Sequence, residues 1–410
     1  MDRPQASLAT VILQNASLIK EKVEDSLHRA FSRRGFYKWA LGYLTLFTCL
    51  ALVVSMAKSP RGDRATTRSL LAEKSSLTNL LNDSEYVHGV VSDDYTTWDA
   101  SFDAKRYMVE RWKTSCYYPT HPIYRLNKLL KVDEMKRRGC VRRLPEVVIA
   151  GVRKCGTGTL LRFLNFHPHL VGPKDETHYF DSLTEHGVQW YREQMPFSSR
   201  LQMTIEKTPT YYFRPFDAPK RIRQTLSSNV RILVILCDPV RRIVSDYVEF
   251  INKTDKAEQD YMQRKTLAES IESTVFEQAR PDNVNTHNEM VDVGIYVKYL
   301  FRWLEQFPRS QIHFIDGDNF RNNPAEELQK VEKFLGVRPF FREEHFRKDS
   351  VKGQYCMAFP QMTCMPSSKG REHPELKEWA KKRLCEFYSP FDRALATLVK
   401  QNFTWIGKNC

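Results

Sequence analysis

Three short apolar runs separated by amphipathic segments constrain the fold of this 410-residue chain more than any other feature. The runs are 146–150 (EVVIA), 231–236 (RILVIL) and 311–315 (QIHFI), and each has the length of one buried strand. Segments with helical spacing lie between them, for example 157–166 and 297–307. Strands that alternate with helices predict an α/β fold with a central parallel sheet covered on both faces. Ligands of such sheets bind at the carboxyl ends of the strands.

The loop after the first run has the composition of an anion-binding loop. Residues 147–161 read VVIAGVRKCGTGTLL, so a buried strand is followed by Arg153, Lys154, Gly156 and Gly158, and then by a helix. Glycines let the backbone approach a phosphate, and the free amides of a helix N-terminus favour an anion. The Gly-Lys-Ser/Thr ending that serves a γ-phosphate and Mg²⁺ is missing. The pattern predicts a P-loop-like three-layer αβα domain; the alternative is an ordinary βα turn with solvent-facing bases.

The stretch 39–57 (WALGYLTLFTCLALVVSMA) is apolar, uncharged and flanked by basic residues. At about 1.5 Å per residue it spans roughly 28 Å, close to the thickness of a bilayer core. A buried core helix and a cleavable signal peptide are the alternatives, but the leader before it is too long for an ordinary signal peptide. We expect a cytoplasmic tail (1–38), a transmembrane signal anchor (39–57), a lumenal stem and linker (58–144) and an α/β domain (145–410).

Composition and net charge exclude two classes of protein and indicate the charge of the partner. Hydrophobic residues make up 41% of the chain and the mean hydropathy is −0.51, which excludes both a wholly disordered chain and a polytopic membrane protein. The net charge of +14 favours an anionic partner, namely a nucleic acid, a phospholipid or an acidic glycan.

Sequons and cysteines point to the lumen of the secretory pathway. Glycosylation is predicted at Asn82, Asn252 and Asn402. The nine cysteines contain no CxxC pair, so no zinc site is expected, whereas Cys356 and Cys364 are close enough in the sequence for a short disulfide loop. These features predict a type II membrane protein with a lumenal domain.

The anion-binding loop and six later motifs resemble the heparan sulfate glucosamine 3-O-sulfotransferases, whose domain opens with GVRKGGT. Each motif is a weak signal alone, but here they occur in the order of that family. They are GVRKCGTGTLLRFLNFHPHL (151–170), KDETHYFD (174–181), VQWYREQMPFSS (188–199), IEKTPTYYF (205–213), DPVRRIVSDY (238–247), GIYVKYLFRWLEQFP (294–308) and SSKGREHP (367–374).

The resemblance implies that residues 145–410 form a sulfotransferase domain in the Golgi lumen. Its reaction would move a sulfuryl group from 3′-phosphoadenosine 5′-phosphosulfate (PAPS) to the 3-hydroxyl of glucosamine in heparan sulfate. A hydroxyl needs a general base, and Glu176 matches the catalytic glutamate of the family. His178 lies two residues on and points the same way if the segment is extended, so we expect it to orient Glu176. Lys154 and Lys207 match the cations that stabilise the departing phosphate.

The resemblance also implies which residues bind PAPS and heparan sulfate, and it implies that no metal is required. PAPS would contact Arg153, Lys154, Cys155, Gly156, Thr157, Gly158, Thr159, Ser245 (through the 3′-phosphate), Tyr355, Lys369, Gly370 and Arg371. Heparan sulfate would contact Lys174, Glu176, Thr177, His178, Asp181, Lys207, Thr208, Pro209, Thr210 and Glu249. The disulfide of the family supports a Cys356–Cys364 pair.

Three positions depart from the pattern of the family. Cys237 stands where the family has the arginine of Leu-Arg-Asp-Pro, a charge-assisted contact worth about 1.5–3 kcal/mol. Arg241 replaces a glutamate nearby, and Cys155 replaces a loop glycine. From the sequence we assign no partner to Cys116, Cys140, Cys155, Cys385 or Cys410.

Alternative functions follow from the same features. An N-sulfotransferase or another glycan sulfotransferase would share the fold, although the Gly-Val-Arg-Lys opening disfavours the former. A catalytically weak heparan-sulfate-binding pseudoenzyme would follow from the loss of the arginine at Cys237. An ATP- or GTP-dependent P-loop enzyme is disfavoured by the missing Gly-Lys-Ser/Thr ending, and a nucleic-acid binder by the lumenal features. The sequence leaves the oligomeric state and the accepted heparan sulfate pattern open.

Overall fold

The computed structural model describes residues 107, 109–118, 128–253, 267–278, 280–350, 353–358, 362–365 and 373–408. All of them lie in one unit, Thr97–Cys410. The expected anchor at 39–57, Asn82, the Lys369-Gly370-Arg371 loop and Cys410 lie outside the described residues. Among the described helices, none has the length and apolar character needed to cross a membrane.

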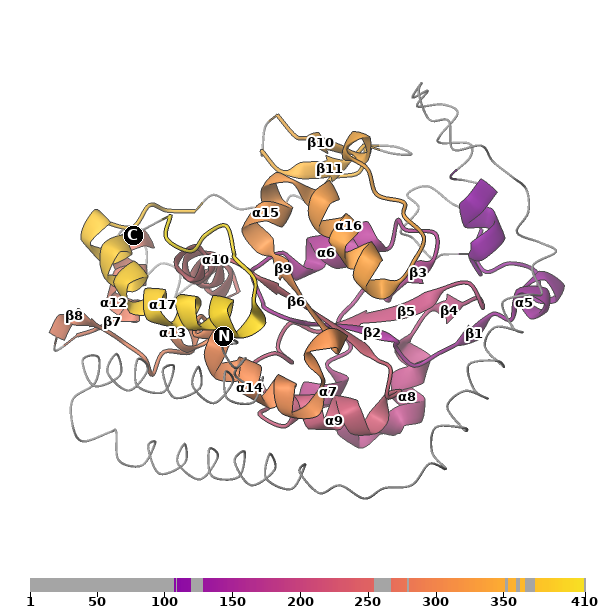
Figure 1. The fold of residues 1–410 in the computed structure, drawn as a ribbon, viewed down its shortest axis with the longest axis horizontal. Helices are drawn as coiled ribbons and strands as arrows, with labels where there is room; N and C mark the ends of the chain where they lie inside the picture. The colour runs from indigo at the N-terminus through magenta and orange to yellow at the C-terminus, as the bar shows by residue number, and fades with distance from the viewer. Residues whose placement is uncertain are drawn as a thin grey trace, which may run out of the picture. The chain divides into compact units, whose positions relative to one another are not determined.

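A five-stranded parallel sheet forms the centre of the unit (Figure 1). In spatial order the strands are β3 (Leu170–Val171), β5 (Met203–Lys207), β2 (Val147–Gly151), β6 (Arg231–Leu236) and β9 (Ile312–Asp316), and all four pairings are parallel. The three predicted runs are β2, β6 and β9, so the α/β prediction is confirmed.

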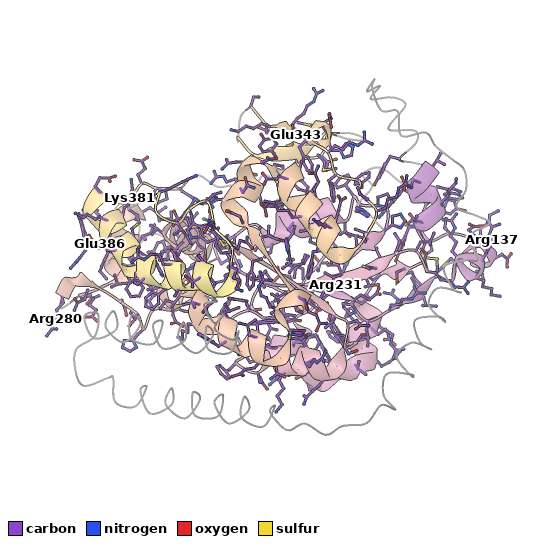
Figure 2. The ribbon with its side chains drawn as sticks, in the orientation of Figure 1. Arg137, Arg231, Arg280, Glu343, Lys381 and Glu386 are labelled. Atoms are coloured by element: carbon purple, nitrogen blue, oxygen red, sulfur yellow. A yellow bond between two sulfur atoms is a disulfide. The ribbon has the colours of Figure 1, made fainter. Side chains whose placement is uncertain are left out.

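Helices cover both faces of the sheet (Figure 1). One layer contains α6 (Thr157–Leu164), α15 (Gly317–Asn322) and α16 (Pro324–Leu335). The other contains α7 (Tyr179–Ser182), α8 (Gly187–Gln194), α9 (Ala218–Thr225) and α14 (Tyr296–Gln306). Because both faces are covered, every residue of β2 is buried, whereas charged side chains such as Arg137, Arg280 and Glu343 lie at the periphery (Figure 2).

The remaining elements flank these layers. The helices are α5 (Val132–Arg138), α10 (Pro239–Ile251), α12 (Leu267–Val275), α13 (Glu289–Asp292) and α17 (Glu378–Val399), with 3₁₀ turns at Thr184–His186, Arg309–Gln311 and Glu343–His345. Three two-stranded antiparallel ribbons pair β1 (Val141–Arg142) with β4 (Phe197–Ser198), β7 (Phe276–Glu277) with β8 (Arg280–Val284), and β10 (Phe346–Lys348) with β11 (Tyr355–Met357).

The helices that follow the central strands begin in two different ways. After β6, the Asp238 carboxylate caps α10 by accepting from the Val240 amide at 2.8 Å. After β9, Asp316 caps α15 by accepting from the Asp318 and Asn319 amides, both at 3.0 Å. No described side chain caps α6, which follows β2. The first turn of α6 therefore has amides with no partner inside the helix.

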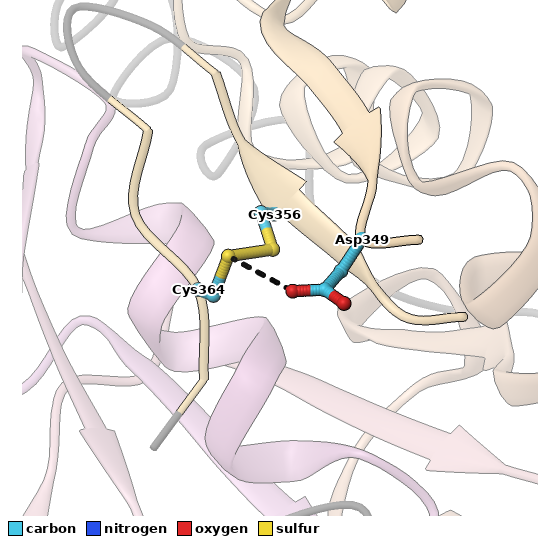
Figure 3. Close-up of side chains that lie close together, drawn as sticks. All are labelled: Asp349, Cys356 and Cys364. Atoms are coloured by element: carbon cyan, nitrogen blue, oxygen red, sulfur yellow. Dashed lines mark hydrogen bonds between the residues drawn. A yellow bond between two sulfur atoms is a disulfide. The ribbon is translucent and has the colours of Figure 1, made fainter. Parts of the chain in front are cut away.

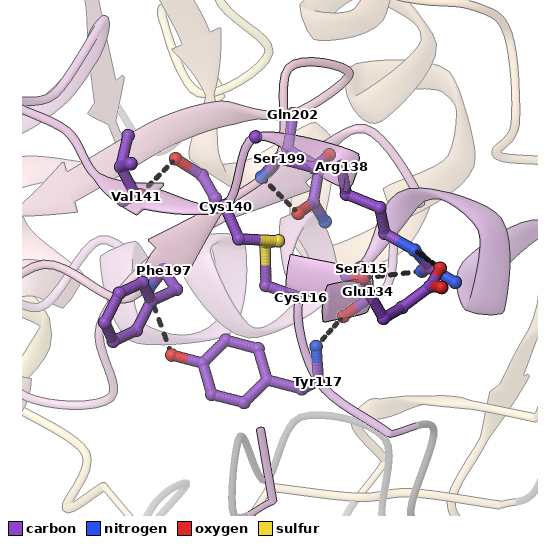
Figure 4. Close-up of a disulfide and its surroundings, with 12 residues drawn as sticks. Ser115, Cys116, Tyr117, Glu134, Arg138, Cys140, Val141, Phe197, Ser199 and Gln202 are labelled. Atoms are coloured by element: carbon purple, nitrogen blue, oxygen red, sulfur yellow. Dashed lines mark hydrogen bonds and ion pairs between the residues drawn. A yellow bond between two sulfur atoms is a disulfide. The ribbon is translucent and has the colours of Figure 1, made fainter. Parts of the chain in front are cut away.

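Residues before the expected domain boundary also pack against the sheet layers. The Arg111 guanidinium donates to the carbonyl oxygen of His167 at 2.7 Å. A disulfide joins Cys116 to Cys140, and the Phe197 amide donates to the Tyr117 hydroxyl at 3.0 Å (Figure 4). Part of the segment that we assigned to the stem and linker is therefore tied to the α/β fold.

At Gly172, which follows β3, the backbone lies close to both β5 and α6. A Cβ there would lie 2.9 Å from the carbonyl oxygen of Ile205 and 2.8 Å from Leu161 Cδ1. We predict that Gly172→Ala lowers the free energy of unfolding by about 1–3 kcal/mol because the backbone must shift, as measured by urea denaturation. Gly158→Ala is the matched control, since a Cβ at Gly158 meets no described atom within 4 Å. Equal stability of the two variants would contradict this prediction.

Candidate active site

The loop between β2 and α6 has the backbone of an anion-binding site. Lys154 and Gly156 both have left-handed backbone conformations, with φ of 72° and 105°. These turns lead directly into the uncapped first turn of α6, and the space beside Gly158 is open. Uncapped amides and the positive end of the helix dipole fit a phosphate.

The two bases of this loop are paired with carboxylates from neighbouring helices. Arg153 Nε lies 2.9 Å from Asp246 Oδ2 on α10, and its Nη1 lies 2.7 Å from Glu289 Oε1 on α13. Lys154 forms an ion pair with Glu249 on α10. The guanidinium of Arg153 is thus a link between elements, whereas Lys154 has one carboxylate partner that an anionic ligand would replace.

Glu249 lies at the loop, where it is paired with bases. Burial alone would raise its pKa, but hydrogen bonds from Lys154 and Lys253 outweigh burial and lower the pKa to about 2. We expected Glu249 to bind sugar hydroxyls; in the structure its carboxylate neutralises the loop lysine. Ser245 precedes Glu249 by one helical turn on α10 and is half-buried, so it lies on the helix whose acidic residues hold the loop.

A second cluster brings the expected catalytic residues together. Lys207, the last residue of β5, forms an ion pair with Glu176 Oε1. His178 Nε2 lies 3.4 Å from Glu176 Oε2, and its Nδ1 lies 2.9 Å from Asp181 Oδ2. The Glu176 carboxylate therefore has a cation on one side and an imidazole on the other.

His178 lies beside Glu176 as expected, but its backbone conformation differs from the expected one. An extended segment was the reason to place both side chains on one face, but His178 has a φ of 51° and directly precedes α7. The Asp181 carboxylate on α7 then holds the ring through Nδ1. Asp181 also accepts from the Thr210 hydroxyl, while its Oδ1 is buried without a hydrogen-bond partner among the described residues.

The other residues expected at the acceptor differ in exposure. Lys174 is exposed and Thr210 is half-buried, whereas Thr177, Thr208 and Pro209 are buried. The hydroxyls of Thr177 and Thr208 both donate to Glu206, so these two threonines support the site from its buried side.

Glu206 is a buried carboxyl next to the site that sequence reasoning missed. Its Oε1 accepts from Thr177 at 2.9 Å and from Thr208 at 2.5 Å, and the Thr208 oxygen accepts from the His178 amide at 3.3 Å. Burial raises the pKa of Glu206 to about 7, although the threonine hydrogen bonds and Lys207 oppose the shift. The available signal was the position of Glu206 next to Ile205 in the IEKTPTYYF motif.

Tyr355 and Cys356 lie on β11, and Cys364 follows Thr363, which forms an isolated bridge with Met357 of that strand. The disulfide that the resemblance implied is present. Asp349 lies beside it, and the three side chains have ligand atoms within 4.8 Å of one another (Figure 3). Both sulfurs are consumed by the disulfide, so they offer no thiolate to a metal. Tyr355 is half-buried on β11.

Positive charge gathers at the carboxyl end of β6. Burial lowers the pKa of His373, and the charges of Arg241, Arg321 and Lys154 lower it further. Arg241 also forms a 2.6 Å ion pair with Asp318. The Asp318 carboxylate also accepts from the amide of Asp238, so Arg241 lies near the residue that follows Cys237.

Cys237 is joined to Cys155 in a second disulfide. Two of the three departures from the pattern of the family thus form one covalent link between the anion-binding loop and the end of β6. Cys116 is paired with Cys140, and Cys385 is also disulfide-bonded. Each of these cysteines lacked an assignable partner in the sequence.

Comparison with known proteins decides the family. Residues 144–401 match the model of the sulfotransferase domain. The chain belongs to the sulfotransferase family. It is 35% identical over 277 residues to human heparan sulfate glucosamine 3-O-sulfotransferase 5, covering 67% of this chain and 77% of that protein. It is 35% identical over 268 residues to human heparan sulfate glucosamine 3-O-sulfotransferase 6, covering 64% and 74%. The resemblance found in the motifs is confirmed.

A solved structure is also similar to this sulfotransferase. It is a sulfotransferase from Alicyclobacillus acidocaldarius, with 20% identity and a TM-score of 0.47, covering 64% of this chain and 98% of that chain.

The raised pKa of Glu206 predicts a pH-dependent stability. A carboxyl whose pKa is about 7 in the folded state, against an ordinary value of 4.5, makes the folded state bind more protons between those values. The free energy of unfolding therefore falls as pH rises from about 4.5 to 7. Glu206→Gln is expected to flatten that fall, as measured by urea denaturation across the range. Glu343→Gln, at an exposed position, should leave the slope unchanged; an unchanged slope in Glu206→Gln would count against the prediction.

Proposed function

We propose that this sulfotransferase transfers a sulfuryl group from PAPS to the 3-hydroxyl of glucosamine residues in heparan sulfate, with Glu176 as the general base. The observation that carries the proposal is the cluster of Glu176, His178 and Lys207 at the sheet edge where the anion-binding loop begins. Lys207 pairs in register with Ile149 of β2. The base and the loop therefore share the carboxyl edge of neighbouring parallel strands.

The loop residues fit the phosphates of PAPS, which supplies the sulfuryl group. The amides of Gly156, Thr157, Gly158 and Thr159 and the Lys154 ammonium would hold the 5′-phosphate, with Glu249 releasing Lys154 when the ligand binds. The same loop carries Arg153 and Cys155, which fix its backbone through an ion pair and a disulfide. Ser245, Tyr355 and the segment Lys369-Gly370-Arg371 would contact the rest of the nucleotide.

The catalytic residues have separate tasks. Glu176 takes the proton of the acceptor hydroxyl, because its carboxylate is one-third exposed and reachable. His178, itself held by Asp181, keeps that carboxylate in position. The Lys207 ammonium is paired with the carboxylate that receives the proton, so it lies beside the reacting atoms. There it stabilises the negative charge on the departing phosphate. Lys174 and Thr210 are accessible for heparan sulfate contacts.

The cellular setting belongs to the same proposal. A single signal anchor at 39–57 would place the domain 145–410 in the Golgi lumen as a type II membrane protein. Disulfides persist in such an oxidising compartment, and the structure has pairs at Cys116–Cys140, Cys155–Cys237 and Cys356–Cys364. Asn252 and Asn402 are both exposed, as glycosylation requires.

We predict that Glu176→Gln lowers kcat by about 10²–10⁴-fold, because the hydroxyl loses its base. The assay uses the full-length chain, ³⁵S-labelled PAPS and heparan sulfate, with disaccharide analysis to locate the label. Binding of adenosine 3′,5′-bisphosphate (PAP) is measured in parallel by calorimetry and should stay within about threefold of the wild type. Glu185→Gln is the control, since Glu185 is an exposed carboxylate on the same segment.

The position of the label tests the proposal against its alternatives. Label on the glucosamine 3-oxygen, lost in Glu176→Gln and kept in Glu185→Gln, supports it. Label on nitrogen or on another oxygen would identify a different glycan sulfotransferase. Heparan sulfate binding with no transfer at high PAPS would identify a pseudoenzyme and overturn the proposal.

A further inference from the structure

The Cys155–Cys237 disulfide lies where the chain leaves two neighbouring strands, β2 and β6, and enters the helices that follow them. Cys155 directly precedes Gly156 in the loop after β2, and Cys237 is the first residue after β6. The strands are hydrogen-bonded neighbours in the sheet, and the Val152 amide still donates to the Ile235 carbonyl at 2.9 Å. The disulfide therefore continues the β2–β6 pairing into the loop, at a point where the backbone hydrogen bonds of the sheet have ended.

Two further elements, α14 and α15, pack against this disulfide. The Tyr296 hydroxyl donates to the Cys237 carbonyl at 2.8 Å and lies 3.6 Å from Cys155 Sγ. At Gly317, which opens α15, a Cβ would lie 3.1 Å from the Cys155 carbonyl oxygen and 3.1 Å from Cys237 Cβ. Cys155 and Cys237 are both buried. The link thus joins the loop to a packed framework and is itself buried.

The loop needs such a link because its other restraints are ion pairs at the ends of two long side chains. Its backbone passes through two left-handed residues, and no described side chain caps the helix that follows. Arg153 and Lys154 are held by Asp246 and Glu249 of α10, and the Lys154 pair is the one that an incoming anion would break. After that exchange, the disulfide still ties the backbone next to Gly156 to the residue before Asp238, the N-cap of α10.

We propose that the Cys155–Cys237 disulfide is a positioning element of the cofactor site. It holds the amides of residues 156–159 in the arrangement that binds the 5′-phosphate of the nucleotide. It also sets the distance from this loop to α10, which carries Ser245. This chain thereby replaces the glycine and the arginine of the related pattern with one covalent restraint. The inference rests on the proposed use of PAPS.

The experiment removes the disulfide from the full-length chain and measures PAP binding by calorimetry, which is independent of turnover. In Cys155→Ser/Cys237→Ser we expect the dissociation constant for PAP to rise about tenfold, because the loop must be ordered on binding. Hydrogen exchange of the loop peptide should speed up, the KM for PAPS should rise with it, and heparan sulfate affinity should stay within about twofold.

Two further variants separate positioning from stability. Cys116→Ser/Cys140→Ser removes a disulfide that lies in a separate small cluster with Tyr117, outside the core that contains Cys155 and Cys237. It should leave PAP affinity within about twofold of the wild type, although it too loses stability. If the serine pair at 155 and 237 fails to fold, Cys155→Ala/Cys237→Val keeps the buried site apolar and is expected to show the same tenfold loss.

The outcomes distinguish this inference from the proposed function. A wild-type chain that does not bind PAP overturns the proposed use of PAPS and this inference together. A wild-type chain that binds PAP, with unchanged affinity and loop exchange in a folded variant lacking the disulfide, overturns only the positioning role. Equal losses of PAP affinity in the 116/140 and 155/237 variants would show a general effect of stability and would also overturn it.

Discussion

The parallel pairing of β2 with both β5 and β6 is the constraint on which the candidate site depends. Because parallel strands end at the same edge, the pairing gathers the anion-binding loop, Lys207 and Cys237 from three distant parts of the sequence. A slip of one residue between β2 and β5 would turn Lys207 to the opposite face of the sheet. The chemistry of this sulfotransferase thus rests on the register of a few buried backbone hydrogen bonds.

Charge balance is the second organising principle of the site. The loop bases are neutralised by acids of α10 and α13, and Lys207 by Glu176, so that buried or half-buried charges have partners. Glu206 is different: it is buried, it accepts only from hydroxyls among the described residues, and its pKa is raised. Its position behind Thr177 and Thr208 connects the strand that ends in Lys207 to the segment that carries Glu176 and His178.

The predicted and observed structures differ where tertiary contacts overrule local pattern. The runs that became β2, β6 and β9 were recognised because a strand buried on both faces is continuously apolar. β5 was missed because its sequence, MTIEK, ends in Glu206 and Lys207, which serve the site. His178 was expected in an extended segment, but it adopts a left-handed conformation at the start of α7, and Asp181 on that helix positions its ring.

The sequence by itself determined the α/β class, the anion-binding loop and the ordered motifs that place Glu176, His178 and Lys207 in a sulfotransferase, because strand burial, glycine spacing and motif order are local properties of the chain. Only the tertiary structure decided which cysteines pair, which carboxylates hold Arg153 and Lys154, and that Glu206 is buried behind the site. Those facts depend on contacts between residues far apart in the sequence, such as Cys155 with Cys237, whose proximity exists only once β2 lies beside β6.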